Sequence, residues 1–111
     1  MTSHRSSDGL DLLHRLQDWY VAECNGDWEH SFGVKIETLD NPGWMVTIDL
    51  LETRWSDLEL PRQVVERAER DWVQTEVTKS QFIGCGGPRN LDEILQVFFS
   101  IIDDRGRQGT S

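Results

Sequence analysis

The sequence has little of what defines several large protein classes. Its two cysteines, Cys24 and Cys85, are too few for the disulfide framework of a small secreted domain. No apolar run approaches the ~18–20 residues that span a bilayer, and residues 1–9 lack the apolar stretch of a secretory signal. We therefore expect no membrane partner and a cytoplasmic location, where both thiols stay reduced.

Basic side chains are also scarce. The chain has 11 Lys and Arg residues against 20 Asp and Glu residues, which gives a formal net charge of −9. Nucleic-acid phosphates repel such a surface, so we expect no nucleic-acid partner. An acidic surface instead favours basic proteins and speeds their association.

Recognisable catalytic motifs are missing. The chain contains no nucleophile elbow, phosphate loop or dinucleotide-binding motif. Asp27-Trp28-Glu29-His30 places carboxylates beside an imidazole, which could bind a metal or transfer protons, but no second His or Cys cluster at ligand spacing accompanies it. We predict no catalytic residues, no metal site and no cofactor.

One thiol keeps an enzymatic alternative open. Cys85-Gly86-Gly87-Pro88-Arg89 is a cysteine in a glycine-rich loop before a helix, a setting that can lower a thiol pKa and hold anions. It bears a superficial likeness to the active loops of rhodaneses and cysteine phosphatases, although these loops are longer and their arginine comes later. The alternative function is therefore a small thiol-dependent, sulfur-transfer-like enzyme that uses Cys85.

Periodicity predicts two helices. Apolar residues at spacings of three and four indicate an amphipathic helix from near Asp8 to about Glu23, ended by Asn25-Gly26. A second helix follows Asn90, a good N-cap with Glu93 in the capping-box position. Its apolar stripe comprises Leu91, Ile94, Leu95, Phe98, Ile101 and Ile102.

Between the helices the period changes to two. Residues 32–39 and 44–51 alternate around Asp40-Asn41-Pro42-Gly43, which predicts an antiparallel hairpin with a type II turn. Residues 52–63 show neither period and are predicted to be a loop. Further strands are predicted at 64–69, 72–77 and 81–85.

These elements define the expected fold class and domain organisation. We predict an α+β domain in the order α-β-β-β-β-β-α, with an antiparallel sheet of about five strands and both amphipathic helices packed on one face. The single domain spans residues 8–103, and the polar segments 1–7 and 104–111 are predicted to be disordered tails.

Three groups of segments carry a family resemblance. They are Leu16-Gln17-Asp18-Trp19-Tyr20 with Gly26-Asp27-Trp28-Glu29-His30; Glu37-Thr38-Leu39-Asp40-Asn41-Pro42-Gly43-Trp44; and Asp71-Trp72-Val73, Phe82-Ile83-Gly84-Cys85-Gly86-Gly87-Pro88 and Asn90-Leu91-Asp92-Glu93-Ile94-Leu95. In this order they resemble the immunity protein 53 family. The likeness spans roughly residues 12–102, and residues 52–63 show no matching pattern. The resemblance implies a bacterial antidote of a polymorphic toxin system that binds and neutralises a cognate toxin, and it transfers no catalytic residue.

The predicted hairpin suggests where a toxin could bind. The loop before its first strand and the loop after its second strand lie at one end of the sheet. We hypothesise that this acidic, aromatic end engages a basic cleft on the toxin domain, which could be a nuclease. Its residues are Asp27, Trp28, Glu29, Glu52, Trp55, Asp57 and Glu59.

Other surfaces and roles stay open at this stage. The opposite end of the sheet, with Asp40, Asn41, Arg70, Asp71 and Arg89, is a second candidate surface, and the open face with Lys35, Glu37, Thr47 and Asp49 is a third. Trp28 and Trp55 could equally pack into the structure. An adaptor protein without a toxin partner is a further alternative function.

Overall fold

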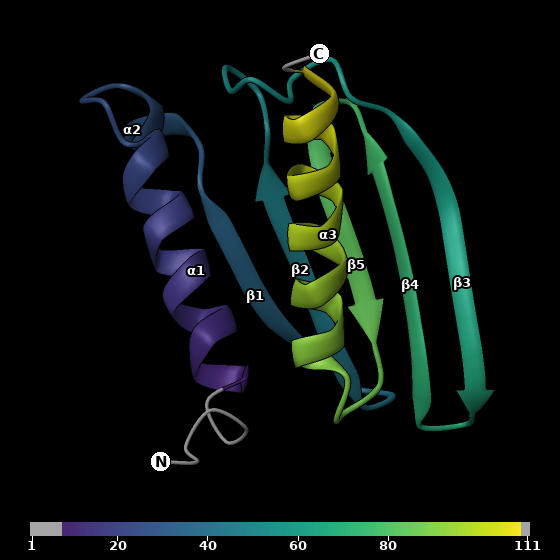
Figure 1. Cartoon of the computed structure of the whole chain (residues 1–111). Coiled ribbons are helices and arrows are strands. Elements are labelled where there is room, and N and C mark those ends of the chain that lie inside the picture. Colours follow the sequence, from purple (N-terminus) through teal and green to yellow (C-terminus); the bar gives the residue numbers. More distant parts are fainter. Residues whose placement is uncertain (1–7, 110–111) are drawn as a thin grey trace, which may run out of the picture. The chain divides into compact units, whose positions relative to one another are not determined.

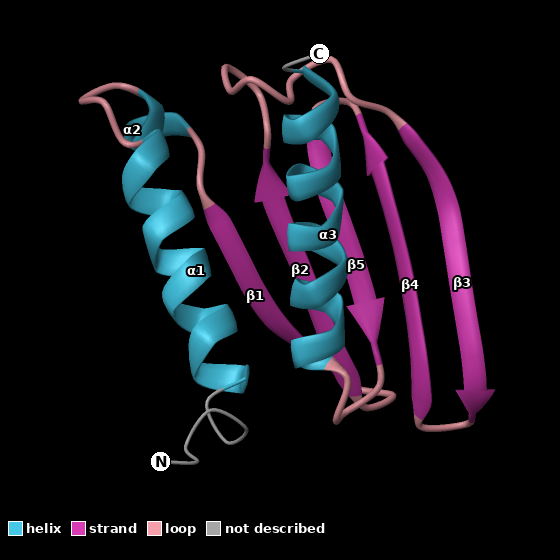
Figure 2. Cartoon of the chain, viewed as in Figure 1, coloured by secondary structure: helices cyan, strands magenta, loops and turns pink. Residues whose placement is uncertain are grey.

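The computed structural model describes residues 8–109, with side chains for 11–104. The chain divides into two compact units, residues 1–33 and 34–111, which are described in turn. The first holds helices α1 (Asp8–Glu23) and α2 (Trp28–Ser31). The second holds strands β1 (Val34–Leu39), β2 (Gly43–Asp49), β3 (Leu60–Ala68), β4 (Asp71–Thr78) and β5 (Gln81–Gly86), and helix α3 (Leu91–Gly109). Figures 1 and 2 show these elements. The predicted α+β class with a five-stranded antiparallel sheet is confirmed.

The sheet has the strand order β1-β2-β5-β4-β3, and every pair of neighbours is antiparallel. The last strand therefore lies at the centre, between two hairpins. The connection from β2 to β3 must cross the ends of β5 and β4 to reach the far edge. A segment that crosses strand ends has no reason to follow the period of a strand or a helix, which explains why residues 52–59 show neither.

The first hairpin is present, but its turn differs from the prediction. Leu39 pairs with Gly43, so Gly43 is the first residue of β2, and the Asn41–Pro42 peptide bond is cis. The predicted type II turn is therefore wrong, because that turn places Pro and Gly at its two central positions. Gly43 meets a packing requirement instead: a Cβ atom there would collide with the carbonyl oxygen of Gly86 on β5.

Strand β3 begins earlier than predicted. The sequence analysis placed residues 60–63 in a loop, whereas the structure pairs Leu60 with Val77 and Gln63 with Thr75. Nearly all of β3 is exposed, because it is an edge strand with a single neighbour. Such a strand needs no alternation of apolar and polar residues, and its proline is tolerated at an edge.

Helix α3 covers one face of the sheet (Figure 1). The rings of Phe98 on α3 and Phe82 on β5 lie 5.2 Å apart, and both side chains are buried. Gly84 lets the helix approach, since a Cβ atom there would lie 2.5 Å from Ile94 Cγ2. The core of this unit therefore lies between α3 and strands β2, β5 and β4, whose inward residues include Val46, Ile48, Val73, Val77 and Phe82.

The helix continues to Gly109, beyond the predicted domain end at residue 103. Residues 104–109 thus belong to α3 in the structure, whereas the sequence analysis placed 104–111 outside the domain. They contain no proline, and each residue added to an existing helix contributes one backbone hydrogen bond, so an apolar stripe is not required there. The predicted tail 1–7 and residues 110–111 lie outside the described residues.

The N-terminal unit is organised around Trp28. Its side chain is 1% exposed, and its ring centre lies 5.9 Å from that of Trp19, 6.1 Å from that of Tyr20 and 6.1 Å from that of Phe32. Helix α1 has the predicted bounds, with Leu16 and Trp19 buried, whereas Leu13 and Tyr20 of the predicted stripe are exposed. The packing of α1 on the sheet stays a prediction.

Candidate partner-binding surface

The chain between β2 and β3 is fixed by hydrogen bonds to the β4–β5 turn. The backbone N–H of Leu50 donates to Ser80 O at 2.7 Å, and the Ser80 hydroxyl donates to Ser56 O at 2.7 Å. The turn itself has Lys79 and Ser80 at positive φ (53° and 64°), as the tight turns of two-residue hairpins require. The start and the middle of this connection are thereby held against the same end of the sheet.

Internal bonds make this connection a folded loop. The Thr53 hydroxyl donates to Leu50 O at 2.7 Å and accepts the backbone N–H of Trp55 at 3.1 Å. Two further backbone bonds join Ser56 to Thr53 and Leu58 to Trp55. A loop that is ordered before binding loses less conformational entropy when a partner docks on it.

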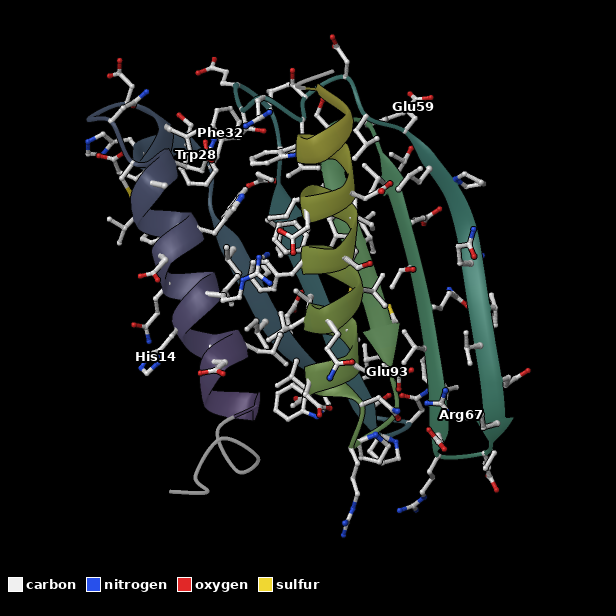
Figure 3. The ribbon with its side chains drawn as sticks, viewed as in Figure 1. His14, Trp28, Phe32, Glu59, Arg67 and Glu93 are labelled. Carbon is white, nitrogen blue, oxygen red and sulfur yellow. The ribbon has the colours of Figure 1, made fainter. Side chains whose placement is uncertain are left out.

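Three of the predicted site residues are exposed on this loop. Glu52, Asp57 and Glu59 are all exposed, and Figure 3 labels Glu59 next to the start of the edge strand. We call Glu52, Asp57 and Glu59 the acidic loop. All three lie on the short segment between β2 and β3.

Trp55, the aromatic residue of the same loop, is half-buried. The guanidinium carbon of Arg54 lies 5.5 Å from the centre of its ring, a distance typical of cation–π contacts. Trp55 is therefore partly used by the protein itself. A partner could reach only its exposed part.

The other three predicted site residues belong to the N-terminal unit, where two of them have structural roles. Trp28 is buried in the aromatic cluster described above, so it offers no anchor to a partner (Figure 3). Glu29 accepts the backbone N–H groups of Asn25 and Gly26, both at 2.9 Å. Only Asp27 is fully exposed, with its side chain free of a capping bond to α2.

Glu29 belongs to a reciprocal set of local bonds. Asn25 Oδ1 accepts the backbone N–H groups of Asp27 and Trp28 at 2.9 Å, while the Glu29 carboxylate binds back to the turn that precedes it. Hydrogen bonds from its own backbone N–H and from Asn25 and Gly26, with the nearby His30, lower the pKa of Glu29. The sequence analysis predicted a loop here, but the segment forms the one-turn helix α2. A signal was present in Asn25, because an asparagine side chain before a helix can accept backbone N–H groups of its first turn.

The opposite end of the sheet carries a polar cluster. Arg67 forms ion pairs with Asp71 and Glu93, and Asn90 Nδ2 donates to both carboxylates at 3.0 Å (Figure 3). These bonds lower the pKa of Asp71 and of Glu93, with the Arg67 hydrogen bonds as the largest cause, and raise the pKa of Arg67. Asn90 precedes α3 as predicted, but its side chain binds the Glu93 carboxylate instead of the Glu93 backbone N–H, so the predicted capping box has a different form.

Cys85 lies in a strand, where the sequence analysis considered a thiol in a loop. It lies within β5, between Gly84 and Gly86, whose missing Cβ atoms would meet Ile94 of α3; its thiol therefore faces the opposite side of the sheet from the helix. Burial raises the pKa of the Cys85 thiol and Glu76 adds to that rise, while Arg62 opposes it. A reactive thiol needs a lowered pKa.

The glycine-rich segment after Cys85 does not form an anion cradle either. The backbone N–H of Gly87 donates to Trp72 O at 3.0 Å, and that of Asn90 donates to Gly87 O at 3.1 Å. A Cβ atom on Gly87 would collide with Arg70 O, which explains the glycine by close packing. Within residues 11–104, no group of three His, Cys, Asp or Glu side chains could hold a metal ion.

The sequence analysis missed an apolar groove beside β3. Leu60, Val65, Val73, Val97 and Ile101 line an open hollow of about 270 Å³ between the edge strand and α3, with Thr75 at its floor and Glu93 at its rim. The helix does not cover β3, so the helix-side residues of this strand stay exposed. The missing signal was the strand itself, because Leu60–Gln63 could not be recognised as part of it.

Together the fold and the site define a small α+β protein whose exposed features are charged loops and a sheet edge. Among the described residues, no helix combines the length and apolar character that crossing a membrane requires. The sequence model described as Immunity protein 53 matches residues 13–103. The chain belongs to the immunity protein 53 family. No curated protein and no solved structure matches it.

Proposed function

We propose that this protein is an antidote that binds a cognate toxin domain and blocks it by occupying its surface. The family supports an immunity role. We place this antidote in the cytoplasm, where its toxin is made. Blocking the toxin requires binding affinity and no catalytic step. Nanomolar affinity corresponds to about 12 kcal/mol of binding free energy, which an interface of ~800 Å² per partner can supply.

The acidic loop carries the proposal for where the toxin binds. Glu52, Asp57 and Glu59 are exposed. Their segment is held in place by a hydrogen bond with Ser80 and by hydrogen bonds within the loop. Fixed charges of one sign steer a partner of the opposite sign during encounter. We infer that the toxin presents a basic cleft, as nucleases do, and that the exposed part of Trp55 adds to the contact. Trp28 and Glu29 support the structure and are left out of the proposed contact.

Charge reversal tests this assignment. The Asp57→Lys/Glu59→Lys variant should associate about tenfold more slowly with the toxin domain encoded beside the gene, and the deficit should shrink as salt screens the charges. Stopped-flow association at several ionic strengths measures both effects. The matched control is Asp40→Lys/Glu69→Lys, which changes the net charge equally in the turns at the other end of the sheet. If the control slows association and the acidic-loop variant does not, the toxin binds at that other end.

The thiol enzyme is the other function that the sequence left open. It is disfavoured by the raised pKa of Cys85 and by the internal use of the Gly87 and Asn90 N–H groups. A Cys85→Ser variant should protect cells from the toxin as well as the unchanged protein does, in a growth assay with both proteins co-expressed. Loss of protection with normal folding would favour the enzymatic alternative.

A further inference from the structure

The edge of the sheet formed by β3 is unusually open to pairing. This nine-residue strand is the last in the order β1-β2-β5-β4-β3. Val64 and Val65 in its middle are 54% and 45% exposed. Proteins usually protect such an edge, because its unpaired backbone groups are a template for another strand. On β3 the register with β4 shifts near both ends and Pro61 lacks a donor, and Arg62, Glu66 and Arg67 add charges. The middle of the strand, Val64 and Val65, carries none of these features.

The segment between the two register shifts has a self-complementary sequence. If two copies of β3 run antiparallel with Val64 opposite its own counterpart, Arg62 of each copy faces Glu66 of the other, and Gln63 faces Val65. Residues that lie directly opposite in an antiparallel pair interact most strongly, and opposite charges there are favourable. A shift of the axis to the Val64–Val65 bond would instead place Arg62 opposite Arg67. Of these two registers, the charges favour the one about Val64.

The side-chain directions agree with this pairing. Val64 pairs with Gln74 and Gln74 with Cys85, so Val64, with Arg62 and Glu66, lies on the sheet face away from α3. Arg62 is 58% exposed and forms a loose ion pair of 3.6 Å with Glu76 on that face, which leaves its guanidinium able to reach a further carboxylate. Val65, in contrast, lines the apolar groove beside α3.

We propose that β3 joins two copies of this chain into a symmetric dimer with one continuous sheet, paired about Val64. The dimer is independent of toxin binding, because its interface is the β3 edge and not the acidic loop. The groove between β3 and α3 becomes bordered by the second copy, and Val65 of each copy loses solvent contact.

The other edge strand provides a matched control. Strand β1 (Val34–Leu39) also has a charge pattern that could pair with itself, Lys35 with Glu37 about Ile36, but it has six residues and a single exposed apolar side chain, Ile36 at 39%. In sedimentation velocity over a range of concentrations, the full chain and Ile36→Lys should dimerise equally, whereas Val64→Lys should remain monomeric. A monomeric parent protein at all concentrations overturns the proposal, and so does a dimer that Ile36→Lys abolishes and Val64→Lys does not.

Exchange of the two charges tests the register. Arg62→Glu places two glutamates opposite each other, and Glu66→Arg does the same with two arginines, so each variant alone should dimerise about tenfold more weakly. An equal mixture should form a heterodimer with both opposite-charge pairs restored. Circular dichroism checks that each variant is folded. A mixture no more dimeric than its components overturns the register.

A disulfide cross-link is a second test of the register that does not rely on exchanged charges. In a Cys24→Ser/Cys85→Ser background, Val64→Cys should form a covalent dimer on mild oxidation, because residue 64 faces its own counterpart across the pair. Glu66→Cys is the control, since it faces residue 62 of the other copy and has no thiol within reach. Equal cross-linking of the two variants would contradict the proposed register.

Discussion

Asn90 connects three parts of the C-terminal unit through one small side chain. It is 6% exposed, its carbonyl accepts the first backbone bond of α3 from Ile94, and its amide donates to Asp71 and Glu93. A residue at a helix N-terminus thus also binds the β3–β4 hairpin to the helix.

Replacement of Asn90 by alanine should therefore cost more than an exposed cap. We expect Asn90→Ala to lower the free energy of unfolding by about 2 kcal/mol, because its hydrogen bonds to the Asp71 and Glu93 carboxylates are lost. Chemical denaturation monitored by tryptophan fluorescence measures the change. Asp92→Ala is the control with a smaller expected effect, because Asp92 lies two residues further along the chain and is exposed. An equal loss of unfolding free energy in both variants would contradict the role of Asn90.

Gly84 matters for packing because it has no side chain, which leaves room for Ile94 of α3. A methyl group there would lie 2.5 Å from Ile94 Cγ2 and 3.1 Å from the Phe82 ring, both of which are buried. We expect Gly84→Ala to destabilise the protein by about 1–3 kcal/mol, as overpacking of a core does. Thermal unfolding should show it, and Gly33→Ala, where a Cβ atom meets nothing within 4 Å, should change the midpoint little.

At the scale of elements, α3 owes its position to burial of one face. Ile94, Leu95, Phe98, Phe99 and Ile102 are all at most 7% exposed, and Phe98 contacts both Phe82 and Phe99 through its ring. We expect Phe98→Ala to cost about 3–5 kcal/mol, because a cavity remains where the ring packed. Gln96→Ala, on the exposed side of the same turn, should leave the unfolding midpoint nearly unchanged in the same denaturant series.

The elements that the sequence predicted well are those with a strong local signal. Helix α1 and the β1–β2 hairpin follow from apolar period and from turn residues, and their bounds agree within two residues. The elements that were missed or truncated depend on their surroundings. Leu60–Gln63 is a strand because Val77 and Thr75 pair with it, and an edge strand leaves no alternation to read.

The candidate site divides in the same way. Glu52, Asp57 and Glu59 lie in the aperiodic segment after the predicted hairpin and are exposed, and their role in binding stays a prediction. Trp28 could not be assigned from the sequence, because an indole in a polar loop can serve a core or a partner equally well. Only the packing of Trp19, Tyr20 and Phe32 around it decides for the core.

For the molecule as a whole, the balance of charges makes the free energy of unfolding depend on pH. Asp71 and Glu93 have lowered pKa values because Arg67 and Asn90 bind their ionised forms. A carboxylate whose folded pKa is depressed stabilises the folded state above its unfolded pKa of about 4, and this contribution is lost as the pH falls through the folded value. The protein should thus lose stability below about pH 4.

This loss can be assigned to the cluster by removal of its cation. In Arg67→Gln the pKa values of Asp71 and Glu93 rise towards their ordinary range, so the variant should be less stable than the parent at neutral pH. The gap should close as the pH falls, because protonated carboxyls gain little from Arg67 in either protein. Unfolding midpoints measured between pH 2 and pH 7 give the pH dependence of stability for the parent and for the variant.

Arg70→Gln is the matched control, since it removes an equal charge next to the cluster in the β3–β4 turn. In a chain with a formal net charge of −9, any lost cation increases general repulsion between carboxylates, and the control has this effect alone. If both variants show the same dependence on pH, general charge and not the bonds of Arg67 governs acid stability. If only Arg67→Gln flattens the slope, the bonds that join β3, β4 and α3 are what acid breaks first.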